Sequence, residues 1–482
     1  MKRASTFLTA ATAAATAASL LASPALAGGL VVARFGGEHG HPTADNPTAI
    51  YYNPAALSLG AGTRLFIDGT FAWRAYSYER PPEAVGQVLD GAGQPGGLQG
   101  GTPSGDGVRA NSGKGDLFNV LASPFLGVAT DFGVEGLGVG AAFYVPIGGQ
   151  SKWNEQDDVA GFPGAKDGSQ RWWVTEGTIR SLYFTAAAGY RIKPARLSLG
   201  LGINAVKSEI YTTRARNGDG TDDLINRSTG GDGTSTADRL KEGRATVDLK
   251  TWDLAVGAGL LYEPIDGMYV GLSYQSQPGF GEQKLEGDSR KILAQSTDIT
   301  SKAFATQQMP DIMRWGWRWR DGLNEYRLFG DYARWSVFDE QCIQSEDSTT
   351  QCDLANIPRN WEDTIGVRAG YSRWITDAVE LYVGAGYDQN AVPDETLEPA
   401  LYDAEKVTAG LGGRFTMLDD SLGIAATYTQ VIYFDRTTDA WPRGDNGKLV
   451  PQGAFATAAN PNSAGTYKQA IGVFNLNVQY AF

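Results

Sequence analysis

The sequence has 482 residues, with 54 acidic and 41 basic side chains, a formal net charge of −13 and two histidines. This negative charge argues against a nucleic-acid-binding protein, because such proteins present basic surfaces to phosphates. Gly is abundant at 62 residues and aromatic residues make up 11% of the chain, which suits closely spaced strands better than packed helices.

The first residues have the pattern of an export signal. Lys2 and Arg3 precede an apolar run rich in Ala and Leu, and Ala25-Leu26-Ala27 supplies the small-x-small pattern of a cleavage site. No later segment reaches the run of about 18 apolar residues that a membrane helix needs. We therefore expect residues 1–27 to be a signal peptide and the mature protein to be exported without a helical membrane span.

Residues 28–62 show little alternation and contain many Gly and Pro residues, so we do not expect them to form strands. Their centre carries Asp45-Asn46-Pro47-Thr48-Ala49 and Asn53-Pro54-Ala55-Ala56. Pro54 fixes its own φ, removes a backbone donor and biases Asn53 toward an extended conformation. An Asn amide can also bridge backbone groups that no strand satisfies. An ordinary turn before a strand is the alternative interpretation.

From residue 63 onward, apolar residues alternate with small or polar ones in segments of about ten residues, which is typical of strands. The links between these segments are alternately long and polar or only a few residues long. This order is typical of an outer-membrane barrel, whereas a soluble sandwich has no reason to keep it. The pattern predicts fourteen strands, at residues 63–78, 119–131, 136–149, 176–192, 196–213, 245–262, 268–286, 308–320, 324–338, 360–374, 377–391, 405–418, 421–435 and 468–482.

The last predicted strand ends in Phe482, with Phe474, Val478 and Tyr480 on the same face. It resembles the C-terminal insertion signal of outer-membrane proteins. The barrel-assembly machinery is therefore an expected partner during biogenesis.

The strand predicted at 308–320 has one aromatic and one basic face. An arginine facing lipid at the bilayer midplane costs about 2–4 kcal/mol, so the basic face is expected to point into the lumen. Arg314 and Arg318, with Arg368 on the tenth predicted strand, are candidate substrate-binding residues, because a guanidinium can dock a carboxylate. The alternative is that they pair with acidic residues of 28–62, such as Asp45. The two faces consist of Trp315, Trp317 and Trp319, and of Arg314, Arg318 and Arg320.

Several motifs resemble the FadL-type family, outer-membrane transporters of long-chain fatty acids and other hydrophobic compounds. The resemblance implies a fourteen-stranded antiparallel barrel over residues 63–482 and an N-terminal hatch, residues 28–62, that plugs its lumen. The signature residues of the hatch are then Asn46, Asn53, Pro54 and Ala55. Besides the two Asn-Pro motifs above, the resemblance rests on Ala33-Arg34-Phe35-Gly36-Gly37-Glu38, Tyr144-Val145-Pro146-Ile147-Gly148-Gly149, Met309-Pro310-Asp311, Arg334-Trp335-Ser336-Val337-Phe338 and Asn360-Trp361-Glu362-Asp363-Thr364.

In the resembled family, a kink in the third strand makes a lateral opening toward the lipid. Pro146, Gly148 and Gly149 fall at the end of the third predicted strand. Proline removes a ladder hydrogen bond and adjacent glycines weaken a strand, so these three residues are candidates for that opening. The alternative is that the strand leaves the membrane here and bends into its loop.

The remaining chemistry is sparse. Cys342 and Cys352 lie in a polar stretch and are a disulfide candidate in an oxidising compartment, with a metal or redox pair as the lesser alternative. His39 and His41 could approach a metal, but polarity within a plug is the favoured interpretation, and we expect no metal and no cofactor. A Ser-His hydrolase would need a histidine on the barrel wall, so we predict that the protein is not an enzyme.

The sequence therefore predicts passive transport of hydrophobic molecules through a plugged barrel in a Gram-negative-type outer membrane. Hatch movement and lateral release at the third strand would complete the path. The expected partners are a fatty acid or aromatic hydrocarbon and outer-membrane lipid, with no nucleic acid. A general diffusion porin and a structural or adhesion barrel acting through its loops are the alternatives.

Overall fold

The computed structural model describes residues 30, 33–85, 105–216, 242–292, 298–438, 461 and 463–482. The predicted signal peptide, residues 1–27, lies outside the described residues.

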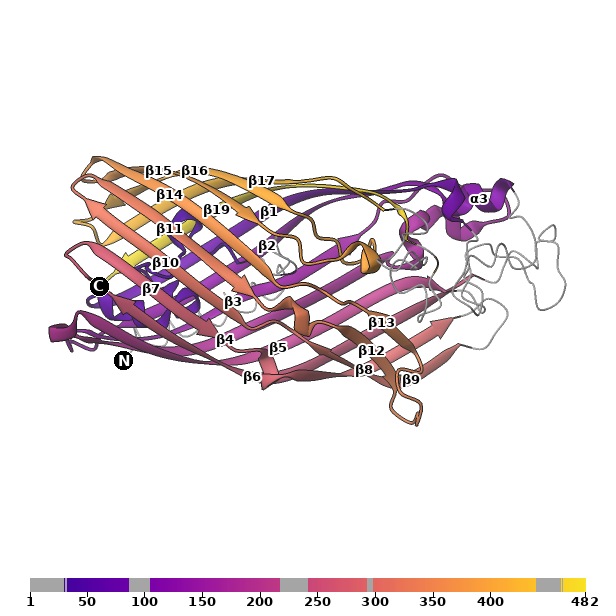
Figure 1. Cartoon of the computed structure of the whole chain (residues 1–482), viewed down its shortest axis with the longest axis horizontal. Coiled ribbons are helices and arrows are strands. Elements are labelled where there is room, and N and C mark those ends of the chain that lie inside the picture. Colours follow the sequence, from indigo (N-terminus) through magenta and orange to yellow (C-terminus); the bar gives the residue numbers. More distant parts are fainter. Residues whose placement is uncertain are drawn as a thin grey trace, which may run out of the picture.

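In the described part of the chain, nineteen strand segments form one antiparallel sheet. The sheet closes on itself because β1 pairs with both β2 and β19 (Figure 1). The segments are β1 (Thr63–Arg80), β2 (Gly113–Thr130), β3 (Leu137–Lys152), β4 (Glu176–Ile192), β5 (Leu197–Arg216), β6 (Gly243–Tyr262), β7 (Met268–Gln275), β8 (Glu282–Ile292), β9 (Ile299–Gln308), β10 (Ile312–Asp321), β11 (Asn324–Ala333), β12 (Glu340–Ser345), β13 (Ala355–Pro358), β14 (Thr364–Thr376), β15 (Val379–Asp388), β16 (Lys406–Met417), β17 (Leu422–Tyr433), β18 (Arg436–Thr438) and β19 (Gly465–Ala481).

The predicted closed barrel of fourteen strands is confirmed, because five of its strands are each split into two segments. The split strands are β7 with β8, β9 with β10, β11 with β12, β13 with β14, and β17 with β18. The prediction of a polar link at 287–307 is wrong for most of its length, since β8 and β9 pair from Glu282 and Gln308 to Lys291 and Ile299. Outward residues of β8 are charged and exposed, which made this stretch look like a loop.

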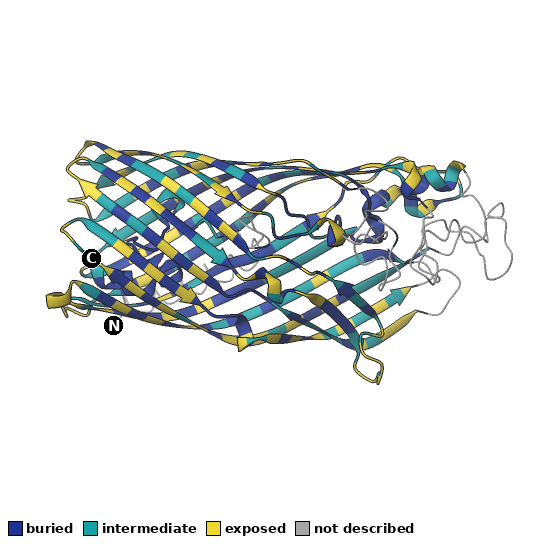
Figure 2. Ribbon diagram, in the orientation of Figure 1, coloured by how far each residue is buried: buried dark blue, intermediate teal, exposed yellow. Residues whose placement is uncertain are grey.

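Buried and exposed residues alternate along the strands, as the chequered ribbon of Figure 2 shows. In β15, Leu381 and Val383 are exposed while Glu380 and Tyr382 between them are buried. Apolar side chains thus face outward and polar ones inward, the arrangement that a barrel wall needs in lipid.

Residues 33–62 form a hatch inside the end of the barrel where the links between strands are short (Figure 1). They contain η1 (Gly37–His39), α2 (Ala49–Tyr52) and η2 (Pro54–Leu59), and every residue from 46 to 58 is buried. No helix among the described residues is long and apolar enough to cross a membrane. The other helices are η3 (Pro82–Ala84), α3 (Gly105–Asn111), η4 (Pro163–Asp167), η5 (Ser169–Trp172), η6 (Lys193–Ala195), η8 (Pro278–Phe280), η9 (Trp335–Val337) and η10 (Asp394–Thr396).

The wall carries glycines where the hatch comes closest. A Cβ on Gly200 of β5 would lie 2.1 Å from the backbone nitrogen of Ala55, and one on Gly189 of β4 would lie 2.5 Å from the Pro54 carbonyl oxygen. No side chain fits at such distances, so the wall and the hatch pack backbone against backbone. The same relation holds between Gly138 and Leu57 and between Gly271 and Pro42, whereas Gly259 leaves room for the Asn53 side chain.

Candidate functional site: a wall gap beside a lumenal cavity

The barrel wall is interrupted between β2 and β3. β3 pairs with β4 as far as Lys152, but it pairs with β2 only from Val139 to Tyr144. Beyond Tyr144, residues 117–124 of β2 face residues 145–152 of β3 without a backbone ladder. We refer to this stretch as the wall gap. It lies in the half of the barrel toward the long links, away from the hatch.

The three residues predicted at a lateral opening all lie in the wall gap. Pro146 has no backbone N–H to donate, and the register with β4 shifts between Tyr144 and Ile147. Gly148 and Gly149 follow directly. The Pro146-Ile147-Gly148-Gly149 sequence of β3 therefore lies where the strand leaves its neighbour β2.

Side chains and one residue of the N-terminal segment take the place of the missing ladder. The Gly148 N–H donates to the Leu30 carbonyl at 3.0 Å. Because these bonds come mostly from side chains, they can open without unfolding a strand. The other bonds at the gap run from Ser123 Oγ to the Val145 carbonyl (3.0 Å), and from Asn119 Nδ2 (3.1 Å) and Arg74 Nη1 (3.3 Å) to the Gln150 carbonyl.

A cavity of about 130 Å³ lies directly inside the wall gap. Leu30, Leu121 and Gly149 line it at the gap itself. The rest of its lining combines aliphatic residues with polar and charged ones, so the cavity has an apolar part next to the wall gap. The aliphatic residues are Val174, Ile179, Ile210, Val247, Leu249, Ala305, Ile343, Ile357, Ala400 and Leu401, and the charged ones are Arg74, Arg214, Arg359 and Glu398.

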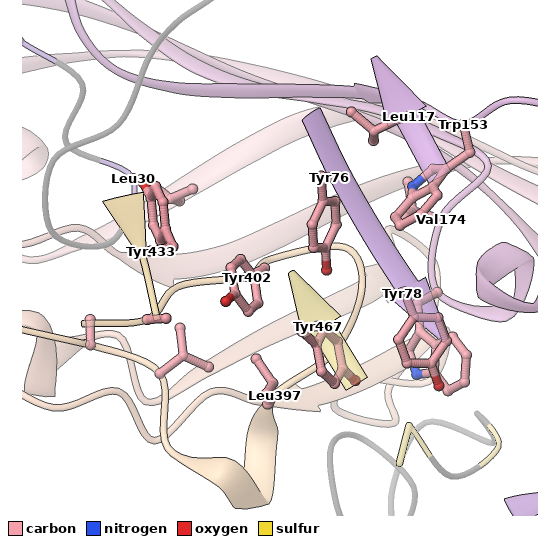
Figure 3. Packing of buried hydrophobic residues seen from close by; sticks show 14 of the residues in the cluster. Leu30, Tyr76, Tyr78, Leu117, Trp153, Val174, Leu397, Tyr402, Tyr433 and Tyr467 are labelled. Carbon is pink, nitrogen blue, oxygen red and sulfur yellow. The ribbon is translucent and has the colours of Figure 1, made fainter. Parts of the chain in front are cut away.

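Stacked aromatic rings surround this region (Figure 3). The centroids of Tyr76 and Tyr402 are 5.2 Å apart, and those of Tyr402 and Tyr467 are 5.7 Å apart with nearly parallel rings. Tyr402 also lines the cavity. The rings give this side of the lumen an apolar and rigid wall.

Three arginines line the cavity, Arg74, Arg214 and Arg359, and the first and last of them differ in their partners. Arg359 Nη1 binds Glu398 Oε1 at 2.7 Å, so its charge is neutralised. Arg74 Nε donates to Gln469 Oε1 at 2.6 Å. Among the described residues, no carboxylate lies within salt-bridge distance of Arg74.

In the hatch, Asn53 ties two segments of backbone together and joins them to the wall. Its Oδ1 accepts from the Ala55 N–H at 3.1 Å and caps η2, while its Nδ2 donates to the carbonyls of Pro42 and of Leu260 on β6, each at 2.9 Å. Pro54 takes the first position of η2, where its missing N–H costs nothing. The signature therefore lies at the contact between hatch and wall.

Asn46 organises the preceding turn of the hatch. Its Oδ1 accepts from the Thr48 N–H at 2.9 Å and hydroxyl at 2.6 Å, and its Nδ2 donates to the His39 carbonyl. His41 lies among packed groups, and burial lowers its pKa well below the ordinary value. The ring is therefore neutral, and its Nδ1 accepts from the Thr43 N–H at 3.3 Å.

The three arginines predicted to bind substrate face the hatch and do not line the cavity. Arg318 pairs with Asp45 at 2.9 Å, which was the alternative role for these residues. Partial loss of solvent favours a raised pKa for Asp45, but the Arg318 guanidinium outweighs it and holds that pKa well below its ordinary value. Arg314 lies over the ring of Tyr51 at 4.2 Å, and Arg368 binds Asp331 at 2.9 Å and Asp388 at 2.5 Å.

Cys342 and Cys352 form a disulfide. It closes the β12–β13 hairpin, in which Gln341 and Ile343 next to Cys342 line the cavity. The bond therefore restrains a part of the cavity wall that lies toward the long links.

Sequence reasoning missed Arg74, Arg359 and Tyr402. Arg74 lies on the inward parity of β1, with Ala72 and Tyr76 on the same face. The alternation of β1 indicates that Arg74 faces the lumen, but the same is true of many other residues, so alternation alone does not single it out. Arg359 and Tyr402 lie outside regular strands, where no periodicity marks the lumenal side.

The sequence profile of the family described as "Outer membrane protein transport protein (OMPP1/FadL/TodX)" matches residues 8–482. Among solved structures, a Pseudomonas aeruginosa FadL homologue is 18% identical with a TM-score of 0.70, covering 94% of this chain and 100% of that one. The Pseudomonas putida toluene transporter TodX is 13% identical with a TM-score of 0.58, covering 95% and 99%. The Ralstonia pickettii toluene transporter TbuX is 14% identical with a TM-score of 0.55, covering 94% and 98%. No curated protein sequence matches the chain directly.

Proposed function

Because the chain belongs to the OMPP1/FadL/TodX family of outer-membrane transport proteins, we propose that it releases long-chain fatty acids or related hydrocarbons sideways into the bilayer through the wall gap. At the level of the family, the protein is an outer-membrane transporter of hydrophobic molecules and not an enzyme. The lateral route and the movement that opens it are the proposal.

The observation that carries the proposal is the contact between the cavity and the wall gap. Leu121 on one edge of the gap and Gly149 on the other both line the cavity. A molecule in the cavity would then be separated from the outside of the barrel by side chains and by Leu30, without a backbone ladder. The outer face of β2 at this height carries Phe118 and Val120, which are 62% and 65% exposed and offer an apolar surface outside the gap.

Energetics favour a sideways exit. Each buried methylene contributes about 0.8 kcal/mol, so release of a long acyl chain into water would be slow. The bilayer is an apolar destination, and a chain that passes through the gap keeps most of its apolar surface out of water. Outer-membrane lipid is then the acceptor of the substrate.

We place the required movement at the start of the hatch. The wall glycines hold the body of the hatch, from Pro42 to Leu57, in direct backbone contact with four strands, β3, β4, β5 and β7. Leu30, in contrast, has one backbone bond to Gly148 in the wall gap. Displacement of Leu30 would widen the gap and leave the seal in place.

Cross-linking across the gap tests the proposal. Cells that carry Asn119→Cys with Gln150→Cys are treated with a short bis-maleimide, and uptake of a radiolabelled fatty acid is measured. Cys342 and Cys352 are bonded to each other, so they do not react. We expect the cross-link to abolish uptake, and a reducible linker to restore it on reduction.

The matched control cross-links Thr130→Cys to Val139→Cys, which are paired in the intact part of the β2–β3 ladder. This cross-link should leave uptake unchanged. Uptake that persists when the gap is cross-linked would contradict lateral release, and liposomes that swell with sugars would support a porin instead.

A further inference from the structure

Arg74 is a cation that contacts both the cavity and the wall gap. It lies on the inward face of β1, lines the cavity and is 9% exposed. Its Nη1 donates to the Gln150 carbonyl across the gap at 3.3 Å, and its guanidinium lies 4.8 Å from the ring centroid of Tyr76. One side chain thus connects the binding space to the edge of the opening.

The charge of Arg74 has no acidic counterpart among the described residues. Burying an uncompensated charge is costly, and Arg359 in the same cavity avoids this cost by pairing with Glu398. Two hydrogen-bond donors at this place also have no acceptor among the described residues. One is Nη2 of Arg74, and the other is the buried Nε2 of Gln469. The Oε1 atom of Gln469 accepts from Arg74 Nε. The arrangement has positive charge and spare donors, and it lacks an anion.

We propose that Arg74 is a specificity-determining residue: it binds the carboxylate of an acidic amphiphile in the cavity and, on doing so, gives up its bond to Gln150 across the wall gap. The inference rests on the proposed function, because it assigns headgroup chemistry and an opening step to the same site. A guanidinium bonds a carboxylate more strongly than a neutral carbonyl, so the exchange favours the acid. Asn119 Nδ2 then remains as the side-chain bond to the Gln150 carbonyl.

The substrate class follows from this exchange. A hydrocarbon or an alcohol of the same length fits the aliphatic lining but carries no anion to compete for Arg74. It therefore occupies the cavity without loosening the gap. Compared with the alcohol, the acid therefore binds more tightly to the cavity and also breaks the Arg74 bond that bridges the wall gap.

A binding experiment on detergent-purified full-length protein tests the first part. Dissociation constants are measured for a saturated long-chain fatty acid and for the primary alcohol of equal length, above the pKa of the acid. We expect the native protein to prefer the acid by about ten-fold or more, the range for hydrogen bonds to charged groups. Arg74→Met should reduce acid binding to the level of the alcohol and leave alcohol binding unchanged.

Two further variants separate specificity from a structural role. Arg74→Lys keeps the charge and should retain part of the preference for the acid. Asn119→Ala removes the other bond to Gln150 without changing charge, so it should speed the release of acid and alcohol alike into liposomes. If Arg74→Met weakens both ligands equally, or neither, the proposal is overturned.

The test of the acid preference is independent of the cross-linking test of lateral release. Uptake that survives cross-linking of the gap would contradict the proposed route, yet the preference for the acid would still be measurable in detergent. Loss of the acid preference with the route intact would contradict the role of Arg74 alone.

Discussion

The two halves of this barrel differ in how the wall is held together. At the hatch, glycines bring wall and plug into direct backbone contact, and β2 and β3 are paired. Toward the long links, the β2–β3 ladder is missing, and side chains bridge the edges around a cavity. The difference teaches that direct backbone contact closes the barrel at the hatch, whereas side chains and the Leu30 carbonyl bridge the wall gap.

The largest effect is expected from filling the contact between wall and hatch. Gly200→Ala places a Cβ 2.1 Å from the backbone nitrogen of Ala55, so the hatch backbone must move. Overpacking of this kind costs about 3 kcal/mol, which urea unfolding in lipid vesicles can measure.

Gly202→Ala is the matched control on the same strand. Its Cβ would have Ala187 at 3.6 Å as its nearest neighbour, an ordinary contact. Equal stability of the two variants would contradict the glycine-mediated seal.

A smaller effect is expected from Asn53→Ala, which leaves the Ala55 N–H and the Pro42 and Leu260 carbonyls without their partner. Loss of the cap and of these bonds should cost about 2 kcal/mol. Planar-bilayer recordings should show new conductance as the hatch loosens. Ser58→Ala removes one hydroxyl of the same hatch and should have a weaker effect, and unchanged conductance in Asn53→Ala would argue against a sealing role.

The smallest effect is expected from the Arg318–Asp45 ion pair, because the Asp45 side chain is 55% exposed and the pair is screened. Arg318→Gln should cost roughly 1 kcal/mol at pH 7. The pKa of Asp45 is lower in the folded protein than in the unfolded chain. The stabilisation is therefore complete above about pH 4 and is lost as the pH falls below it.

Urea titrations at pH 7 and pH 2 test this pH dependence of the stabilisation. The difference between native protein and Arg318→Gln should shrink at pH 2. A difference of the same size at both pH values would mean that the pair does not contribute through the charge of Asp45.

Much of the fold is predictable from alternation and from the order of long and short links. The interruptions are harder to predict: the break after Gln275 does carry a turn signal, Pro278-Gly279, but the pattern on either side of it predicts a single strand over residues 268–286. The outward residues of β8 are charged and most of those of β9 are polar, so this pair of strands looks like a loop in the sequence.

The candidate site was only partly predictable. Pro146 and Gly148 mark the wall gap because their backbone chemistry weakens a strand wherever it lies. Arg314 and Arg318 are inward, yet whether an inward arginine meets the hatch or the cavity depends on its height in the barrel and on its partners. Arg74 and Arg359 come together from distant parts of the chain, which alternation does not reveal.

The most direct test of lateral release is photolabelling with a long-chain fatty acid that carries a diazirine near its tail, followed by mass spectrometry of the labelled peptides. The account predicts labels on Leu121 and Gly149 at the wall gap and on Phe118 and Val120 outside it. Labels concentrated on the hatch from Asp45 to Leu57 and on the facing wall, with none at the gap, would show that the substrate passes through the plug and would contradict the account.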